Sequence, residues 1–348
     1  MNPYILVVLF SGVGLGTTLV FASSHWLLAW MGLEMNTLAI VPIMARPHHP
    51  RAVEAATKYF LVQAAGAAVI LFAATANAWL TGQWDLTQLT HPLAANLLVL
   101  ALALKLGLAP LHSWLPEVLQ GLDLVTGLIL STWQKLAPIA LMTQLQPANN
   151  TLMIILAITS MMVGGWGGQN QTQLRKVLAY SSIAHLGWMM IVLPFFPQMT
   201  ILALVTYILM TSSTFLVFKY NKVTTINALA TTWAKTPILT ALVPLLLLSL
   251  AGLPPLTGFM PKWLIIQELA NQGLALVATM AALMALLSLY FYLRVTYAMT
   301  LISPPNNMTS TLPWRLPSSQ PTLPLALFAT LAMTALPMTP AFLALTYV

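Results

Sequence analysis

Long apolar segments dominate this chain, and only short polar connections separate them. Eleven such segments follow one another, at residues 3–22, 25–45, 53–80, 92–120, 123–145, 150–169, 174–194, 199–220, 236–270, 273–300 and 322–346. A helix that crosses a bilayer needs about 20 consecutive, mostly apolar residues. Only 5% of the 348 residues are charged, against roughly 25% in a soluble domain. The sequence therefore predicts an all-α polytopic membrane protein with eleven transmembrane helices.

Two of these segments, 92–120 and 236–270, are too long for one straight crossing, and each contains a copy of the same sequence block. The first copy reads GLAPLHSWLPE and the second reads GLPPLTGFMPK. Proline lacks the backbone N–H that a helix interior needs. Within a membrane, an interrupted backbone is tolerated only where it is buried in protein or lines a wet cavity. We therefore expect a broken helix in each copy, with the breaks marked by Gly107, Pro110 and Pro116 and by Gly252, Pro254, Pro255 and Pro261.

The two blocks lie in the fourth and the ninth predicted helices, so the two copies should have opposite orientations in the membrane. The sequence thus predicts two five-helix inverted repeats within one membrane domain, over residues 1–148 and 149–301, followed by a loop and a final transmembrane helix over 302–348. Paired, Gly/Pro-interrupted segments in two related halves are a pointer to a transport site.

Lysine and arginine occur in four of the five alternate predicted connections, and the fifth, the turn near 121–123, has none. They collect at 46–51, 175–176, 219–235 and 294–315, whereas the connections near 22–25, 81–91, 146–149, 195–199 and 271–273 have none. By the positive-inside rule, the basic side is the cytoplasm or the mitochondrial matrix, and the N-terminus lies on it. We interpret the first segment as a spanning helix rather than a removed signal peptide. Because the net charge of +7 is scattered along the chain, it does not indicate nucleic-acid binding.

Four ionisable residues lie well inside predicted spans: Glu34, Lys105, Lys135 and Lys262. A charge at the centre of a bilayer costs at least ~2.5–3.5 kcal/mol, so such residues usually serve a function. Burial favours the neutral form of a lone amine, whereas a neighbouring carboxylate favours the ammonium form. If Glu34 pairs with Lys105, opening the pair lets the lysine release a proton, which Lys135 and then Lys262 can carry outward. The alternative is a static ion pair that fixes helix packing.

Two histidines also fall in this region of the sequence. His112 follows the first expected break, and His185 lies in the middle of a predicted span. Imidazole titrates near neutrality and suits a proton shuttle. The alternative for each is a hydrogen-bonded polar residue between helices. The chain has no cysteine, which excludes disulfides and iron–sulfur clusters, and we expect it to carry no cofactor, no metal and no redox centre.

Three motifs accompany these residues: WLLAWMGLEMN at 26–36, KLGLAPLHSWLPEV at 105–118 and LAGLPPLTGFMPKW at 250–263. With the four charges, they resemble the antiporter-like membrane subunits of respiratory complex I, and the resemblance runs over the whole chain. It implies a proton-pumping subunit of the H⁺-translocating NADH:ubiquinone reductase. It also implies that Glu34 and Lys105 are the coupling pair, Lys135 the central relay residue and Lys262 the outer exit residue.

The resemblance further implies a location in the mitochondrial inner membrane with the N-terminus in the matrix. Bacterial relatives carry three further N-terminal helices, so the length resembles the shortened animal form. NADH, FMN, iron–sulfur clusters and ubiquinone would be handled elsewhere in the complex. The implied partners are other membrane-arm subunits and phospholipid such as cardiolipin, with no nucleic acid. Two alternatives remain open, a stand-alone cation/proton antiporter and a structural scaffold of the membrane arm.

Overall fold

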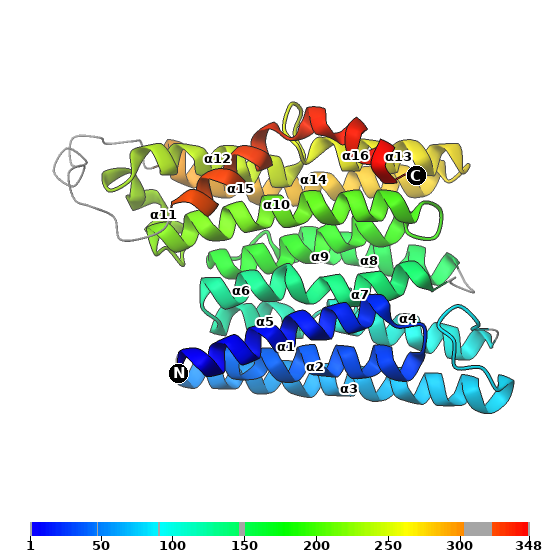
Figure 1. Ribbon diagram of the computed structural model, residues 1–348. Helices are drawn as coiled ribbons and strands as arrows, with labels where there is room; N and C mark the ends of the chain where they lie inside the picture. Colours follow the sequence, from blue (N-terminus) through cyan, green and yellow to red (C-terminus); the bar gives the residue numbers. More distant parts are fainter. Residues whose placement is uncertain (1, 47, 90, 146–149, 303–321, 347–348) are drawn as a thin grey trace. The chain divides into compact units, whose positions relative to one another are not determined.

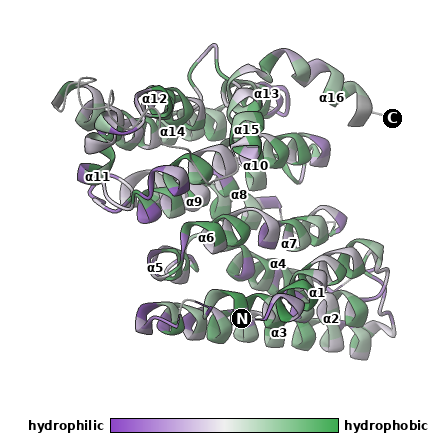
Figure 2. Cartoon of the chain, turned by 60° about the vertical axis from the view of Figure 1, so that its left-hand side comes forward, coloured by the Kyte–Doolittle hydropathy of each residue, from purple (hydrophilic) through white to green (hydrophobic). Residues whose placement is uncertain are grey.

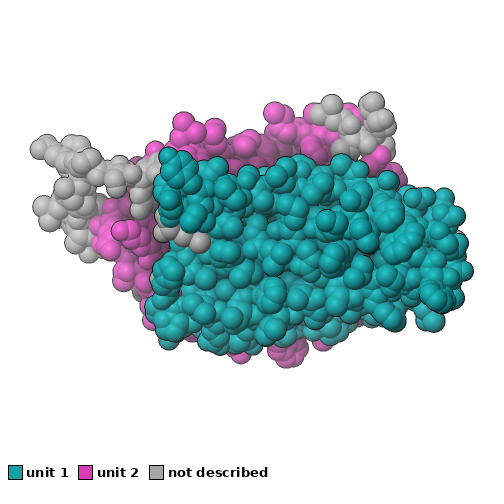
Figure 3. All heavy atoms as spheres, turned by 60° about the horizontal axis from the view of Figure 1, so that its bottom comes forward, with its two compact units in different colours: residues 1–160, 193–195 teal, residues 161–192, 196–348 magenta. Residues whose placement is uncertain are grey.

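The computed structural model describes residues 2–46, 48–89, 91–145, 150–302 and 322–346, and these ranges contain helices and no strand (Figure 1). The expected connection at 146–149 and nearly all of the expected loop at 302–321 lie outside the described residues. The chain forms two compact units, one of residues 1–160 with 193–195 and the other of residues 161–192 with 196–348 (Figure 3).

The first unit is a bundle of apolar helices. Helix α1 packs on α2, α2 on α3, and α3 on both α4 and α5, while α7 contacts α1, α2, α4 and α6. Small residues permit these close approaches: a side chain at Gly16 or Gly32 would collide with the facing helix. The helices of this unit are α1 (Pro3–Ala22), α2 (Trp26–Met44), α3 (Pro50–Thr81), α4 (Pro92–Leu106), α5 (Trp114–Gly121), α6 (Leu124–Ser131), α7 (Trp133–Gln144) and the first part of α8 (Asn150–Gly167).

The second unit is built around α10, which contacts α9, α12, α13, α15 and α16. Helix α14 packs against α9, α12 and α13. The elements of this unit after α8 are α9 (Leu174–Val192), α10 (Pro197–Asn221), α11 (Ile226–Ala230), η1 (Thr231–Ala234), α12 (Pro237–Ala251), α13 (Phe259–Asn271), α14 (Ala275–Tyr297), η2 (Ala298–Ile302), α15 (Leu323–Thr334), η5 (Leu336–Met338) and α16 (Thr339–Thr346).

The all-helical, membrane-type architecture is confirmed. A helix lies in each of the eleven predicted segments. Within the described ranges, seven helical segments are long and apolar enough to cross a membrane, with α6 and α7 counted together as one segment. The number is eight if the bent pair α15–α16 is also one span. Two shorter apolar helices, α4 and α12, are the first halves of the segments that we predicted to be broken. Hydrophobic residues make up most of the helices, and the hydrophilic ones lie mainly at helix ends and in connections (Figure 2).

Both expected breaks are present. Gly107 caps the C-terminal end of α4 and Gly252 caps that of α12, with φ angles of 82° and 81°. This left-handed conformation ends helices and favours glycine, which has no Cβ. Each break contains a cis peptide bond, Ala109–Pro110 in the first and Pro254–Pro255 in the second. The helix resumes at Trp114 in the first block and at Phe259 in the second.

Pro116 and Pro261 do not lie in the interruptions themselves. Each is the third residue of the helix that resumes, α5 or α13. The first turn of a helix tolerates proline because its N–H groups have no intrahelical partner there. These two prolines therefore mark where the second half-helix begins.

The last apolar segment differs from the sequence prediction of one continuous helix over 322–346. The chain bends by 71° between α15 and α16. Pro337 lies in the short 3₁₀ turn between them. Because proline cannot donate the hydrogen bond that continues a helix, this position interrupts the segment.

Candidate functional site

Lys105 lies in the last turn of α4 and is 6% exposed. Gly66 of α3 faces it, and a Cβ there would come within 3.2 Å of the Lys105 Cγ, so the small residue lets the two helices approach. From the same face of α3, the Gln63 amide donates a hydrogen bond of 3.2 Å to the Lys105 carbonyl. Among the described residues, no hydrogen-bond partner lies within reach of the Lys105 ammonium.

Glu34 lies on α2 and is half-buried. Its carboxylate accepts a hydrogen bond of 2.8 Å from the Thr37 hydroxyl, one turn along the same helix. Within the described part of the chain, the ion pairs closer than 4.0 Å include no contact between Glu34 and Lys105. Their direct pairing therefore stays a prediction.

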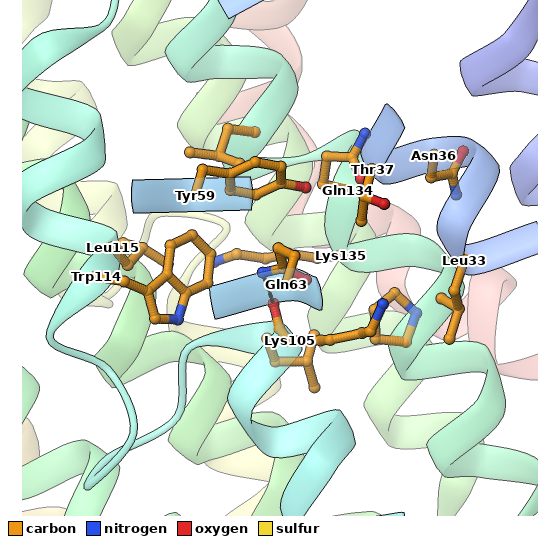
Figure 4. A pocket seen from close by; sticks show the side chains of 13 residues that line it. Leu33, Asn36, Thr37, Tyr59, Gln63, Lys105, Trp114, Leu115, Gln134 and Lys135 are labelled. Carbon is orange, nitrogen blue, oxygen red and sulfur yellow. Dashed lines mark hydrogen bonds between the residues drawn. The ribbon is translucent and has the colours of Figure 1, made fainter. Parts of the chain in front are cut away.

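Lys135 is the third residue of α7 and is 3% exposed. It lines the same internal cavity as Lys105, with side chains from α2, α3, α5 and α6 completing the wall (Figure 4). About 20 Å³ of this cavity is open to the centre of a water molecule, which is enough for one water by the usual requirement of roughly 10–15 Å³. The fold of the first unit thus brings two buried lysines from different helices to one polar cavity.

The second unit brings Lys262 and His185 together. The Lys262 ammonium donates a hydrogen bond of 2.7 Å to the carbonyl of Ala251, the last residue of α12. It also lies 5.9 Å from the centre of the Trp188 ring. His185 is buried on α9, with its ring centroid 5.5 Å from that of Tyr207. Lys262, His185 and Trp188 together line two small adjoining cavities.

His112 lies in the break between α4 and α5 and is half-buried. It is not among the residues that line the cavity of Lys105 and Lys135. The break therefore places His112 near the relay residues in sequence without adding it to that cavity.

Several polar residues at these cavities were missed by the sequence reasoning: Tyr59, Gln63 and Gln134 in the first unit, and Trp188 in the second. Tyr207, whose ring contacts that of His185, was missed as well. A signal existed for the first three. Tyr59 and Gln63 are four residues apart in an otherwise apolar stretch of α3, which places them on one face of the helix. Gln134 directly precedes Lys135. Within the described ranges, no three His, Asp or Glu side chains gather closely enough to hold a metal ion.

Comparison with known proteins gives two family matches that together cover most of the chain. Residues 23–288 match the family described as NADH:quinone oxidoreductase/Mrp antiporter, TM, and residues 289–343 match NADH dehydrogenase subunit 2 C-terminus. The chain is 68% identical to NADH-ubiquinone oxidoreductase chain 2 of Tetraodon nigroviridis over 99% of both chains. It is 65% identical to the chain of the same name from Carassius auratus, over 99% of this chain and 100% of the relative.

Solved structures of related proteins have a similar fold. A chain in respiratory complex I from Thermus thermophilus with bound Aureothin matches with a TM-score of 0.86 and 29% identity, over 97% of this chain and 79% of that one. A chain of the Mrp complex from Dietzia sp. matches with a TM-score of 0.82 over 99% of this chain and 76% of that one. Its 16% identity shows a shared fold alone. On the full-length identities and the two family matches, the chain belongs to the NADH-ubiquinone oxidoreductase chain 2 family.

Proposed function

We propose that this chain is the proton-translocating, antiporter-like subunit that its family contributes to respiratory complex I, and that Glu34, Lys105, Lys135 and Lys262 form its proton relay. Membership of the family supports the first part: the chain is a subunit of the NADH:ubiquinone oxidoreductase and couples electron transfer elsewhere in the complex to proton pumping. His112 and His185 are proposed as auxiliary proton carriers of the same relay.

The shared cavity of Lys105 and Lys135 is the observation that carries the relay. Burial disfavours the charged form of each ammonium group, and a second positive charge in the same cavity disfavours it further. A proton on one lysine therefore opposes a proton on the other. Glu34 lies on α2, which contributes Leu33, Asn36 and Thr37 to the cavity wall, and a carboxylate favours a positive charge placed close to it. Movement of Glu34 towards or away from Lys105 would then bias which lysine holds the proton.

The test is to replace Lys135 by methionine, which keeps the length and apolar stem of the side chain but removes the amine. We expect the assembled complex to lose at least about tenfold in proton pumping, since a removed proton carrier typically costs 10²–10⁴-fold. Lys219→Met is the matched control, because Lys219 is exposed in the last turn of α10. Unchanged pumping in Lys135→Met at equal assembly would remove Lys135 from the relay.

We further propose eleven membrane crossings arranged as two inverted repeats, residues 1–148 and 149–301, with a final segment over 302–348. The matching Gly/Pro blocks and their similar helix ends support this arrangement. The alternation of basic and uncharged connections supports an N-terminus in the matrix of the mitochondrial inner membrane. Other membrane-arm subunits and phospholipid, such as cardiolipin, are the proposed partners. The flavin, iron–sulfur clusters, NADH and ubiquinone are proposed to bind elsewhere in the complex.

A further inference from the structure

The backbone of the first break is attached to a helix that is distant in the sequence. Beyond the end of α4, the N–H groups of Gly107 and Leu108 both donate to the Ala103 carbonyl, each over 3.0 Å. The next residue, Ala109, is buried. Its N–H donates a hydrogen bond of 3.0 Å to the hydroxyl oxygen of Ser160 on α8. The chain is therefore fixed to α8 directly after the turn that closes α4.

The Ser160 hydroxyl is suited to accept this bond. It is buried, and its own proton goes to the Leu156 carbonyl of α8, over 2.6 Å. A hydroxyl has one proton and two lone pairs, so a lone pair remains for the Ala109 N–H. The neighbouring Thr159 hydroxyl lies 3.2 Å from the Ala109 carbonyl, but its single proton is shared with two carbonyls of its own helix. Ser160 therefore provides the more defined contact.

Close packing limits how far α8 can shift, so Ser160 has a well-fixed position. A Cβ on Gly164 of α8 would lie 2.6 Å from the backbone nitrogen of Ala184 on α9. A Cβ on Gly165 would lie 2.9 Å from the Cβ of Leu287 on α14. The α8 backbone thus lies directly against both of these helices. A group carried by a packed helix is placed more precisely than one carried by a loop.

The second sequence block cannot form the same contact. Both blocks close the first half-helix with the same backbone turn. The position of Ala109 is occupied by Pro254 in the second block, and proline has no backbone N–H to donate. The position of Lys105 is occupied by Leu250. The block that carries the buried amine is thus the one that can be attached to a neighbouring helix in this way.

We propose that Ser160 is a positioning residue for proton translocation, because its hydroxyl attaches the first break to α8 and so holds Lys105 at the cavity that Lys105 shares with Lys135. This proposal rests on the relay proposed above. Lys105 belongs to the last turn of α4, and the turn that closes this helix leads directly into Ala109. A shift of Ala109 is therefore passed on to the end of α4 and to the lysine that it carries.

Three substitutions separate positioning from packing. Ser160→Ala removes the acceptor of the Ala109 N–H. Ser160→Cys fills the volume of the side chain, but sulfur is only a weak acceptor. Ser213→Ala is the matched control, because Ser213 is also buried and its hydroxyl donates to the Met210 carbonyl of its own helix, α10.

The experiment measures NADH oxidation, protons pumped per NADH and the unfolding midpoint in intact complex I that contains each variant chain. We expect both Ser160 variants to pump at least about threefold fewer protons per NADH, since a misplacement of about 1 Å can cost up to about 10²-fold in rate. Ser213→Ala should pump like the wild type. If Ser160→Ala prevents assembly, Ser160→Cys carries the test, because it leaves no cavity.

Two results would overturn the positioning role. A bond that is merely structural would lower the unfolding midpoint of Ser160→Ala and leave the protons pumped per NADH unchanged in the assembled complex. Wild-type pumping by Ser160→Cys would show that filling the volume at this position is sufficient.

Lys135→Met, measured in the same series, separates failure of this proposal from failure of the relay. If Lys135→Met loses pumping while both Ser160 variants keep it, the positioning role is wrong and the relay stands. If Lys135→Met pumps like the wild type, the relay is wrong. A loss of pumping in the Ser160 variants alone would then show that Ser160 acts by another route, which also overturns the role proposed here.

Discussion

At the scale of single residues, Lys262 differs from Lys105 in what its ammonium contacts. The Lys262 ammonium donates to the carbonyl of Ala251, at the end of α12, and faces the ring of Trp188. The carbonyl end of a helix and an aromatic face both stabilise a positive charge. Lys105 has no such hydrogen bond among the described residues. Lys262 therefore combines two roles, a proposed proton carrier and a cap on the helix end that the break exposes.

Two substitutions of Lys262 separate these roles. Lys262→Met leaves the Ala251 carbonyl without its donor, which we expect to cost about 1–3 kcal/mol of stability. Lys262→Arg retains a cationic donor, but arginine does not release its proton in proteins. We expect the methionine variant to lose both thermal stability and pumping, and the arginine variant to keep stability while losing pumping. Unfolding midpoints and pumping rates of the purified complex decide this. Wild-type pumping by Lys262→Arg would reduce Lys262 to a structural cap.

At the scale of elements, the two broken helices use different side chains to satisfy the carbonyl groups that each break exposes. Each break leaves carbonyls at the end of the first half-helix without intrahelical donors. In the first break, the Trp114 indole N–H donates a hydrogen bond of 3.1 Å to the Leu104 carbonyl. In the second, the Lys262 ammonium serves the Ala251 carbonyl. Of these two hydrogen-bond donors, only the one in the second break can change its charge.

The second break also depends on the absence of a side chain at Gly258. A Cβ on Gly258 would collide with the carbonyl oxygen of Ser249, which is part of the α12 backbone. We expect Gly258→Ala to force α12 and α13 apart and to lower stability by at least about 1–3 kcal/mol, the usual cost of overpacking. The readout is the unfolding midpoint of the complex together with the amount of assembled subunit.

Gly14 provides the matched control for this steric argument. It lies within α1, and a Cβ there would meet nothing within 4 Å. Alanine is favoured over glycine in a helix interior by about 0.5–1 kcal/mol, so Gly14→Ala should assemble at least as well as the wild type. Equal stability of Gly258→Ala and Gly14→Ala would contradict the close approach at the second break.

The helices and both breaks could be predicted from the sequence because they depend on local signals. Segment length and apolar content place the helices, and glycine and proline place the interruptions at Gly107 and Gly252. Pro337 also indicates an interruption of the helix, but the apolar stretches on both sides of it favoured the prediction of one continuous helix. The sequence marks Tyr59 and Gln134 as polar residues in apolar stretches, but it does not show that they line the same cavity, because that depends on which helices meet there.

At the scale of the whole molecule, the distribution of apolar surface fits a protein surrounded by hydrocarbon. Only 22% of the most apolar stretch of α1 is buried, against 67% of that of α10. Along α14, the large exposed side chains recur on one face at intervals of three or four residues; they are Leu276, Met280, Leu283, Leu286, Tyr290, Leu293 and Tyr297. In water such a stripe would be an aggregation hazard, whereas lipid tails solvate it at no cost.

The proposed eleven crossings predict on which side of the membrane each connection lies. Because the natural chain has no cysteine, single cysteines can report this without background from the chain itself. His49, Gln83, Thr224 and Gln272 are exposed positions at helix ends or in connections. We expect His49→Cys and Thr224→Cys to react with a membrane-impermeant maleimide only from the matrix side, in inverted inner-membrane vesicles. Gln83→Cys and Gln272→Cys should react only from the opposite side, in mitoplasts.

The pair Thr224 and Gln272 is the decisive one, because the broken helix α12–α13 lies between them in the chain. If α12 and α13 together cross the membrane, the two cysteines label from opposite sides. If the break turns the chain back as a re-entrant loop, both cysteines label from the same side. Only α14 then crosses the membrane between the basic connections 219–235 and 294–315, which would place these two connections on opposite sides. That outcome would invalidate the inverted repeat. It would leave the cavity of Lys105 and Lys135 untouched, because every residue that lines it comes from the first unit.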